Sequence, residues 1–464
     1  MNTLALAFRN IFRNSRRSLM TMLAVAVGAL AILIFGGFVS AIVLSFQTFI
    51  VQNTGHLHVY KRGYFDFGAG NPSAYGIGDY RRLMQEIAED PVLKPMIAVT
   101  TPSLTLFGIA GNFAANTSKT FFGTGLVPSE RERMRRWNAY GLQGLTWRES
   151  ALRDDDREGG VIGVGLARML SLCAALKVAN CPAPPPRADV SDKPVDEDIA
   201  ALAAAEAPAD GGAAADPRPR IDLLAATAGG APNVVNLRVA RAENQGIKEL
   251  DDAYVAMHLD LAQRLVFGRG EPKVTALILQ LHRSGDLGAA QARLQAIIAE
   301  RGLDLEVRDF AQLTPMYPQV IGMFGTIFGF IAVIMGVIVL FTIANTMSMS
   351  VMERINEIGT LRALGQRRSG VRRQFLAEGF LLGLFGATLG VLAAILAAFA
   401  MNHSGMSWTP PGNSAPVPLT ILLFQSKLLV PAAWVCLTVL ATLSTLFPAN
   451  KAARMVVVDA LRHA

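Results

Sequence analysis

Charged residues are scarce in this sequence. Asp, Glu, Lys and Arg make up 17% of its 464 residues, whereas soluble globular domains average about 25%. Hydrophobic residues, at 52%, are gathered into four long runs with the charged residues between them. This distribution excludes an ordinary soluble protein and predicts an α-helical membrane protein. The long stretch between the first two runs carries enough charge to form a separate water-soluble domain.

Cysteine is also rare, with three in the chain. Three cysteines are too few for a disulfide framework, and their spacing does not match a zinc site. Cys436 lies inside an apolar run, where it is read as a small packing residue. Cys173 and Cys181 lie close together in the stretch predicted to be outside the cytoplasm, where a disulfide can persist. For this pair, a local disulfide and two free thiols are both open alternatives.

Motifs of catalysis and metal binding are absent too. The sequence has no nucleophile elbow, no zinc-protease motif and no phosphate-binding loop ending in Gly-Lys-Ser or Gly-Lys-Thr. His56 and His58 stand two apart without a clustered third ligand, so a polar strand face is preferred to a metal site. We therefore predict that the chain is not an enzyme and has no catalytic residue, bound cofactor or metal. The net charge of +7 does not indicate nucleic-acid binding, because the basic residues cluster beside apolar runs.

The four apolar runs are each long enough to cross a membrane. About 20 apolar residues are needed to span the hydrocarbon core. The first run is too long for a signal peptide and lacks a small-residue cleavage site after it. We predict transmembrane helices at residues 19–45, 319–349, 375–401 and 428–447.

Orientation follows from the basic residues in the short flanking segments, which stay in the cytoplasm. Basic residues precede the first run, join the second to the third and follow the fourth, at Arg9, Arg13, Arg16, Arg17, Arg354, Arg362, Arg367, Arg368, Arg372, Arg373, Lys451, Arg454 and Arg462. Both termini are therefore predicted to be cytoplasmic. The remaining segments are a cytoplasmic interfacial helix at 1–18, a large extracytoplasmic (periplasmic) α/β domain at 46–318, a cytoplasmic coupling loop at 350–374, a short extracytoplasmic loop at 402–427 and a cytoplasmic tail at 448–464.

The soluble domain is predicted to contain two α/β pieces separated by a biased insert. Strand and helix patterns occur at 56–60 and 79–88 in the first piece, and at 234–239, 259–267, 275–281 and 287–298 in the second. The stretch 182–232 is rich in Ala, Pro, Gly and Asp and has few large apolar side chains. Such a composition does not bury enough surface to offset chain entropy. We expect a flexible insert, with partner recognition as the alternative.

The segment after the second run carries the most specific pattern. It reads Glu353-Arg354, then Glu357-Ile-Gly359, then Leu361-Arg362-Ala-Leu-Gly365. Apolar residues recur here at helical spacing beside charged ones, which predicts an amphipathic helix over 351–364 that stops at Gly365. A surface helix with a solvated charged face is the alternative.

This segment, with Phe375-Leu-Ala-Glu378-Gly379 and the ending Pro448-Ala-Asn-Lys-Ala-Ala-Arg454, resembles the FtsX-like ABC transporter permease family. Gly55-His-Leu-His-Val59 and Gly246-Ile-Lys-Glu249 are similar to stretches of the lipoprotein-releasing (LolC/LolE-type) permeases within it. The resemblance implies a multi-pass protein of the bacterial cytoplasmic (inner) membrane. Its implied partners are a cytoplasmic ABC ATPase that uses ATP and Mg, a second permease subunit, membrane lipid and a periplasmic carrier or adaptor. The implied ATPase-coupling residues are Glu353, Arg354, Glu357, Gly359, Arg362 and Gly365.

The resemblance favours transport of a lipoprotein, lipid or other amphiphile. Efflux of a drug or peptide, and signalling to an extracytoplasmic hydrolase without transport, are the alternatives. Bulky apolar residues at the outer ends of the first two spans suit an acyl chain, since each buried methylene contributes about 0.8 kcal/mol. The candidate substrate-facing residues are Phe46, Phe49, Ile50, Val320, Met323 and Phe324. Packing of these residues against bulk lipid or one another is the competing interpretation.

Overall fold

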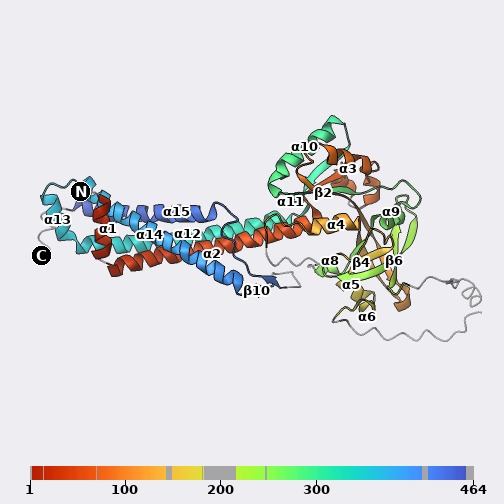
Figure 1. Cartoon of the computed structure of the whole chain (residues 1–464), viewed down its shortest axis with the longest axis horizontal. Coiled ribbons are helices and arrows are strands. Elements are labelled where there is room, and N and C mark those ends of the chain that lie inside the picture. The colour runs from red at the N-terminus through yellow and green to blue at the C-terminus, as the bar shows by residue number, and fades with distance from the viewer. Residues whose placement is uncertain are drawn as a thin grey trace, which may run out of the picture.

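The computed structural model describes residues 3–13, 15–68, 70–142, 149–179, 181, 216–245, 248–409 and 416–455. A bundle of long helices forms one end of the molecule and an α/β domain forms the other (Figure 1). Helices α2 (Ser15–Thr54) and α12 (Met316–Glu353) run from the bundle to the domain. The chain enters the domain from α2 and leaves it into α12, so the domain is an insertion between the first two long helices.

Four helices are long and apolar enough to cross a membrane: α2, α12, α14 (Arg368–His403), and α15 (Leu429–Ser444) with its continuation α16 (Leu446–Arg454). With 40 and 38 residues, α2 and α12 are each about 60 Å long, twice the hydrocarbon thickness of about 30 Å. Each helix is therefore about twice as long as a membrane-spanning segment needs to be, and in Figure 1 both extend past α15 toward the α/β domain.

Small residues set the packing of the bundle. A Cβ added at Gly383 of α14 would lie 2.5 Å from Cβ of Ala441 on α15, and one at Gly390 would lie 2.5 Å from Cβ of Ala29 on α2. Such close approach is possible only without a side chain. Helix α14 thus lies between α2 and α15, and its glycines pack within one subunit.

The α/β domain is built on a mixed nine-stranded sheet with the order β3-β7-β4-β6-β5-β2-β8-β1-β9. The strands are β1 (Leu57–Lys61), β2 (Ile97–Asn112), β3 (Thr117–Leu126), β4 (Gly159–Gly163), β5 (Arg220–Ala226), β6 (Pro232–Glu243), β7 (Tyr254–His258), β8 (Ala276–Leu281) and β9 (Leu305–Asp309). Strand β2 is shared by two halves of the sheet: residues 97–103 pair with β8, and residues 104–112 pair with β3. Because β2 pairs with both β3 and β5, strands β2 to β7 form a closed ring.

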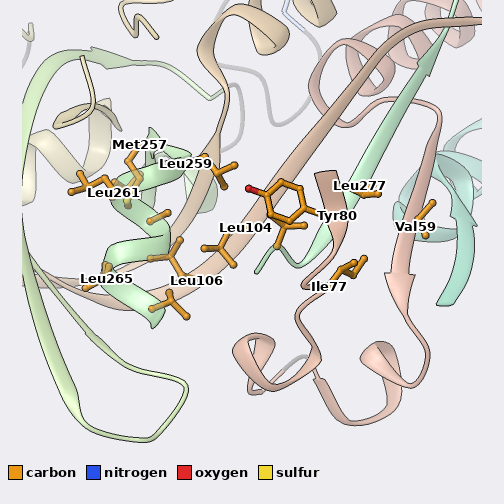
Figure 2. Close-up of a cluster of buried hydrophobic side chains, with 14 of the residues drawn as sticks. Val59, Ile77, Tyr80, Leu104, Leu106, Met257, Leu259, Leu261, Leu265 and Leu277 are labelled. Carbon is orange, nitrogen blue, oxygen red and sulfur yellow. The ribbon is translucent and has the colours of Figure 1, made fainter. Parts of the chain in front are cut away.

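One hydrophobic core joins the two halves. Helix α9 (Leu259–Phe267) contacts β2, β3, β5, β6 and β7 and contributes Leu261 and Leu265 to the core. Figure 2 shows the cluster passing from Val59 and Leu277, beside Tyr80, to Leu106 and Leu265. Helices α3 (Tyr80–Glu89) and α10 (Leu287–Glu300) add buried leucine and isoleucine side chains from the other half.

The remaining elements are short. They are α1 (Thr3–Arg13), α4 (Pro128–Arg135), α5 (Val164–Met169), α6 (Cys173–Leu176), α8 (Lys248–Asp251), α11 (Phe310–Leu313), α13 (Ile355–Ala363), η1 (Tyr64–Gly68), η2 (Pro72–Tyr75), η3 (Phe113–Ala115), η4 (Ser284–Asp286), β10 (Ser407–Trp408) and β11 (Val417–Pro418).

The secondary structure predicted for the domain agrees with the structure except at the end of the insert. The stretch 182–232 was predicted to be flexible, but residues 220–226 form β5, which pairs with both β2 and β6. Its alternate residues Ile221, Leu223 and Ala225 are buried. The predicted insert therefore extended too far, because averaging composition over a long window hid a short strand of period two. Residues 182–215 of the insert lie outside the described residues.

Candidate functional site

The junction between α12 and α13 lies at the end of the bundle that is farthest from the α/β domain, next to α1 (Figure 1). We call this the basic end; it comprises α1, the start of α2, the end of α12, α13, the start of α14, and α16. The predicted single helix over 351–364 is broken at Arg354, which has φ −107° and ψ 16° and separates α12 from α13. Helix α13 ends at Ala363, and Gly365 follows with φ +92°, a left-handed conformation that favours glycine. The junction is thus a defined bend.

A buried ion pair holds this bend. Arg354 Nη1 donates to Glu378 Oε1 at 3.1 Å and to Oε2 at 3.3 Å, and the two residues are only 6% and 4% exposed. Asn10 Nδ2 of α1 donates to Glu378 Oε1 at 2.7 Å. Three segments far apart in the sequence therefore meet at one carboxylate. A cavity of about 30 Å³ lies beside it, lined by Asn10, Arg17, Ser350, Arg354 and Glu378 among others; at the 10–15 Å³ that one water needs, it has room for about two waters.

Two more exposed ion pairs tie the N-terminal segment to the same bend. Arg13 Nη2 lies 2.7 Å from Glu357 Oε2, and Arg17 pairs through both terminal nitrogens with the carboxylate of Glu353. Exposed pairs of this kind contribute only about 0–1 kcal/mol each. Their main consequence is geometric, because they keep α1 and the start of α2 beside α13.

The structure places most of the candidate ATPase-coupling residues in contacts within the chain. Glu353, Arg354 and Glu357 are engaged in the ion pairs above, and Arg362 Nη1 donates to the carbonyl oxygen of Met455 after α16. Gly359 is buried with Ile358, whereas Gly365 is exposed. The charged face predicted to meet a partner is therefore largely an internal clamp.

Two exposed leucines lie at the end of α13 and directly after it. Leu361 is 42% exposed and Leu364 is 80% exposed. Residues three apart are neighbours on one face of a helical turn, so the two side chains lie on the same side. A continuous helix from Val351 would have placed Leu361 on the buried side. The bend at Arg354 changes the helical phase, so the residues that face solvent also change. The sequence feature that could have revealed this pair is the three-residue spacing of Leu361 and Leu364, once the helix is taken to begin at Ile355.

The candidate substrate-facing residues lie at the opposite end of the long helices and are not all on one surface. Ile50 is 5% exposed and packs in a cluster with Val51, Trp137 and Phe310, so it faces protein. Phe46 lies against Tyr317, with ring centroids 5.7 Å apart. Val320 and Phe324 are half-buried, and Phe49 and Met323 are exposed. Only the last two keep the open position that contact with a cargo requires.

Helix α12 is the least covered of the four long helices. In its most apolar 18-residue window 11% of residues are buried, whereas the other three helices have 44%, 39% and 33%. Among the described residues, no heavy atom lies within 4 Å of a Cβ added at Gly322, Gly325 or Gly329. Ile327, Phe330, Val337 and Phe341 are exposed on the same helix. These three glycines of α12 thus differ from Gly383 and Gly390 of α14, which pack within the chain.

The cysteines and histidines have local roles. A disulfide joins Cys173 and Cys181. The backbone N–H of Leu281 donates to His56 Nδ1 at 3.0 Å, and His58 stacks on Tyr60. Burial lowers the pKa of both histidines to about 4, because the charged form is poorly solvated there. Within the described residues, no group of three or more His, Cys, Asp or Glu side chains is arranged to hold a metal.

Comparison with known proteins identifies the helical part. Residues 329–457 match the family described as FtsX-like permease C-terminal, so most of α12 and all of α13 to α16 form an FtsX-like permease domain. The chain is similar to the ABC transporter permease YtrF of Bacillus subtilis (strain 168), with 34% identity over 30% of this chain and 32% of that protein. It is similar to the macrolide export ATP-binding/permease protein MacB of Escherichia coli, with 28% identity over 40% of this chain and 27% of MacB. It is also similar to MacB of Escherichia coli (strain K12), with 40% identity over 26% of this chain and 16% of that protein. The matches thus span less than a third of these curated relatives.

Proposed function

We propose that this chain is the permease subunit of an ABC transporter, driven by ATP hydrolysis in a separate cytoplasmic ATPase. It would extract or export a lipoprotein, lipid or other amphiphile across or from the bacterial cytoplasmic (inner) membrane. The observation that carries the proposal is helix α13, which lies within the FtsX-like domain, is clamped to three other segments and presents an exposed apolar pair. An exposed leucine pair, Leu361 on a short helix and Leu364 directly after it, suits a hydrophobic groove on a partner protein.

The clamp supplies a route for motion. A push on α13 acts directly on α14 through the Arg354–Glu378 pair and on α1 and α2 through Arg13 and Arg17. Helix α12 ends at this bend and is unbroken from there back to the α/β domain. Movement that starts at the ATPase would therefore reach the domain through α2 and α12.

The orientation proposed is that the basic end lies in the cytoplasm with both chain termini. The basic residues described before α2, between α12 and α14 and in α16 all belong to this end of the bundle, and an excess of Lys and Arg in short loops is typical of the cytoplasmic side, which supports the proposed orientation. A reporter placed within residues 366–370 should therefore be cytoplasmic, and one placed at the exposed β5–β6 turn near Gly229 should be external. The reverse result at either position would overturn this orientation.

A second permease chain, identical or related, is proposed to cover α12. Its exposed apolar face and its open glycines are the features that let two membrane helices approach closely. The proposed cargo surface is Phe49 and Met323, which are exposed near the domain ends of α2 and α12. A periplasmic carrier or adaptor would then receive the cargo at the α/β domain.

Efflux of a small molecule is the second candidate, favoured by the similarity to proteins named for macrolide export. Photo-crosslinkers at Phe49 and Met323 separate the two. Capture of a lipoprotein or lipid that decreases with ATP and the ATPase would support the first candidate. Capture of a small-molecule probe with the same ATP response would support the second. A crosslinker at buried Ile50 is the matched control and should capture neither.

The coupling role is tested by Leu364→Glu. The partner ATPase is first identified by co-purification from native membranes. Because Leu364 is 80% exposed, the variant should fold and insert normally but lose the ATPase on co-purification. Ser369→Glu places the same charge on the exposed start of α14 and should retain the ATPase. Normal ATPase binding and cargo movement by Leu364→Glu would reject the proposed role of α13.

A further inference from the structure

A pocket of about 140 Å³ opens between α12 and α16 at the basic end. Its apolar lining residues are Met349, Val351, Met352 and Pro448. Its polar lining residues are Asn345 and Ser348 of α12 and Lys451 of α16. The volume is roughly ten times the 10–15 Å³ needed for one water, which is the scale of a lipid head group.

The two polar groups of this pocket are free to bind a ligand. Within the described part of the chain, neither the amide of Asn345 nor the ammonium of Lys451 has a hydrogen-bond or ion-pair partner. The Ser348 hydroxyl already donates a hydrogen bond to the carbonyl oxygen of Ala344, at 2.7 Å. An amide without a partner on a membrane-spanning helix is costly, so its position calls for a polar partner from outside the chain.

The charges around the pocket select an anion. The carboxylates described at the basic end are Glu353, Glu357 and Glu378, and each is engaged by an arginine from another segment. No carboxylate in the described residues of this end is therefore left for Lys451, nor for Arg372, Arg373 and Arg454. An uncompensated positive field beside a cluster of apolar methionines fits an amphiphile whose head group is negative.

We propose that this pocket binds the phosphodiester head group of an anionic phospholipid. Lys451 is the counter-ion, the Asn345 amide donates to a phosphate oxygen, and Met349 and Met352 contact the glycerol and the start of the acyl chains. The occupant is a membrane lipid and not a soluble phosphate, because four of the seven lining residues are apolar. The inference depends on the membrane embedding of the proposed function but not on the ATPase or the cargo.

The position of the pocket gives the lipid a structural consequence. Val351 and Met352 belong to the last turn of α12, directly before the bend at Arg354. A lipid held there by α16 and α12 together stabilises the contact between the two helices next to the bend.

The test uses the full chain, purified in mild detergent and analysed by native mass spectrometry with added phosphatidylglycerol or phosphatidylcholine. Wild type should retain phosphatidylglycerol selectively. Lys451→Gln should bind it about fivefold more weakly, because one lysine near an anionic lipid surface contributes about 1 kcal/mol. Asn345→Leu, which is compatible with a membrane helix, should also weaken retention. Arg454→Gln is the matched control, since it removes one charge from the same helix without lining the pocket.

Each of the other outcomes overturns the proposal. Equal retention of both lipids would show that the pocket has no preference for an anion. Equal losses in Lys451→Gln and Arg454→Gln would show a general electrostatic attraction and no site. Displacement of the lipid by excess inorganic phosphate would assign the pocket to a soluble anion. An intermolecular disulfide that joins two copies of the Met349→Cys variant through the introduced thiols would show that a second chain covers the pocket. Because no ATPase is present, none of these results depends on the coupling role of α13.

Discussion

Breaking the buried pair at the bend is the sharpest test of the clamp. Glu378→Gln leaves Arg354 charged and enclosed, without its buried counter-ion and with only the half-exposed carboxylate of Glu357, 3.5 Å from Nε. Removing one partner of a buried ion pair typically costs about 3–5 kcal/mol, because the remaining charge keeps its desolvation cost and loses its partner. With Asn10 also losing a charged acceptor at 2.7 Å, we expect a loss in the upper part of that range.

The double variant Arg354→Met/Glu378→Leu separates stability from coupling. Replacing both members of a buried pair by apolar groups of similar volume is often neutral for stability. The double variant should therefore recover most of the stability lost by Glu378→Gln. It should still transmit motion poorly from α13 to α14, because the link between them is gone.

The measurements are unfolding of the purified chain in detergent and the ratio of cargo moved to ATP hydrolysed with the partner ATPase. Glu353→Gln is the matched control, because it makes the same chemical change in the exposed pair with Arg17 and should cost about 1 kcal/mol at most. Equal losses in Glu378→Gln and Glu353→Gln would refute the role of burial. A double variant with a normal coupling ratio would refute the mechanical role of the pair.

Three further predictions test other parts of the molecule. Gly383→Leu should destabilise the isolated chain by about 1–3 kcal/mol through overpacking against Ala441, whereas Gly325→Leu should leave it stable and weaken association of two copies, as light scattering in detergent would show. The unfolding free energy of the domain should fall as the pH drops from about 6.5 to about 4. Unfolded histidine takes up a proton in this range, whereas buried His56 and His58, with pKa values of about 4, do not. Each histidine should account for about 3 kcal/mol of the loss, so His58→Phe should roughly halve the slope of the unfolding free energy against pH. Deleting residues 184–214 with a short bridge should leave the domain folded in proteolysis assays, whereas deleting 184–230 should not, because it also removes buried Ile221 and Leu223.

The sequence was sufficient for features that depend on local pattern. The four long helices follow from uncharged apolar runs, and α3, α9 and α10 follow from helical spacing. These signals are local because hydropathy and periodicity are properties of neighbouring residues.

Features that depend on contacts between distant segments were not predictable in this way. Glu378 was recognised only as part of a motif, and nothing in its neighbourhood indicates that it accepts from both Arg354 and Asn10. The internal engagement of Glu353 and Glu357 by Arg17 and Arg13 depends on α1 folding back beside α13. The exposure of Leu361 depends on a one-residue bend that helical periodicity does not register.

The shared strand β2 has a mechanical consequence for the whole molecule. Of its 16 residues, 97–103 pair with β8 in one half of the sheet and 104–112 pair with β3 in the other. The two halves therefore resist sliding or rotating past one another. The domain should therefore move as a rigid body at the ends of α2 and α12. A tilt of about 5° at the basic end of a helix about 60 Å long displaces its far end by about 5 Å. A small displacement beside α13 would thus become a larger movement at the domain, about as wide as an acyl chain.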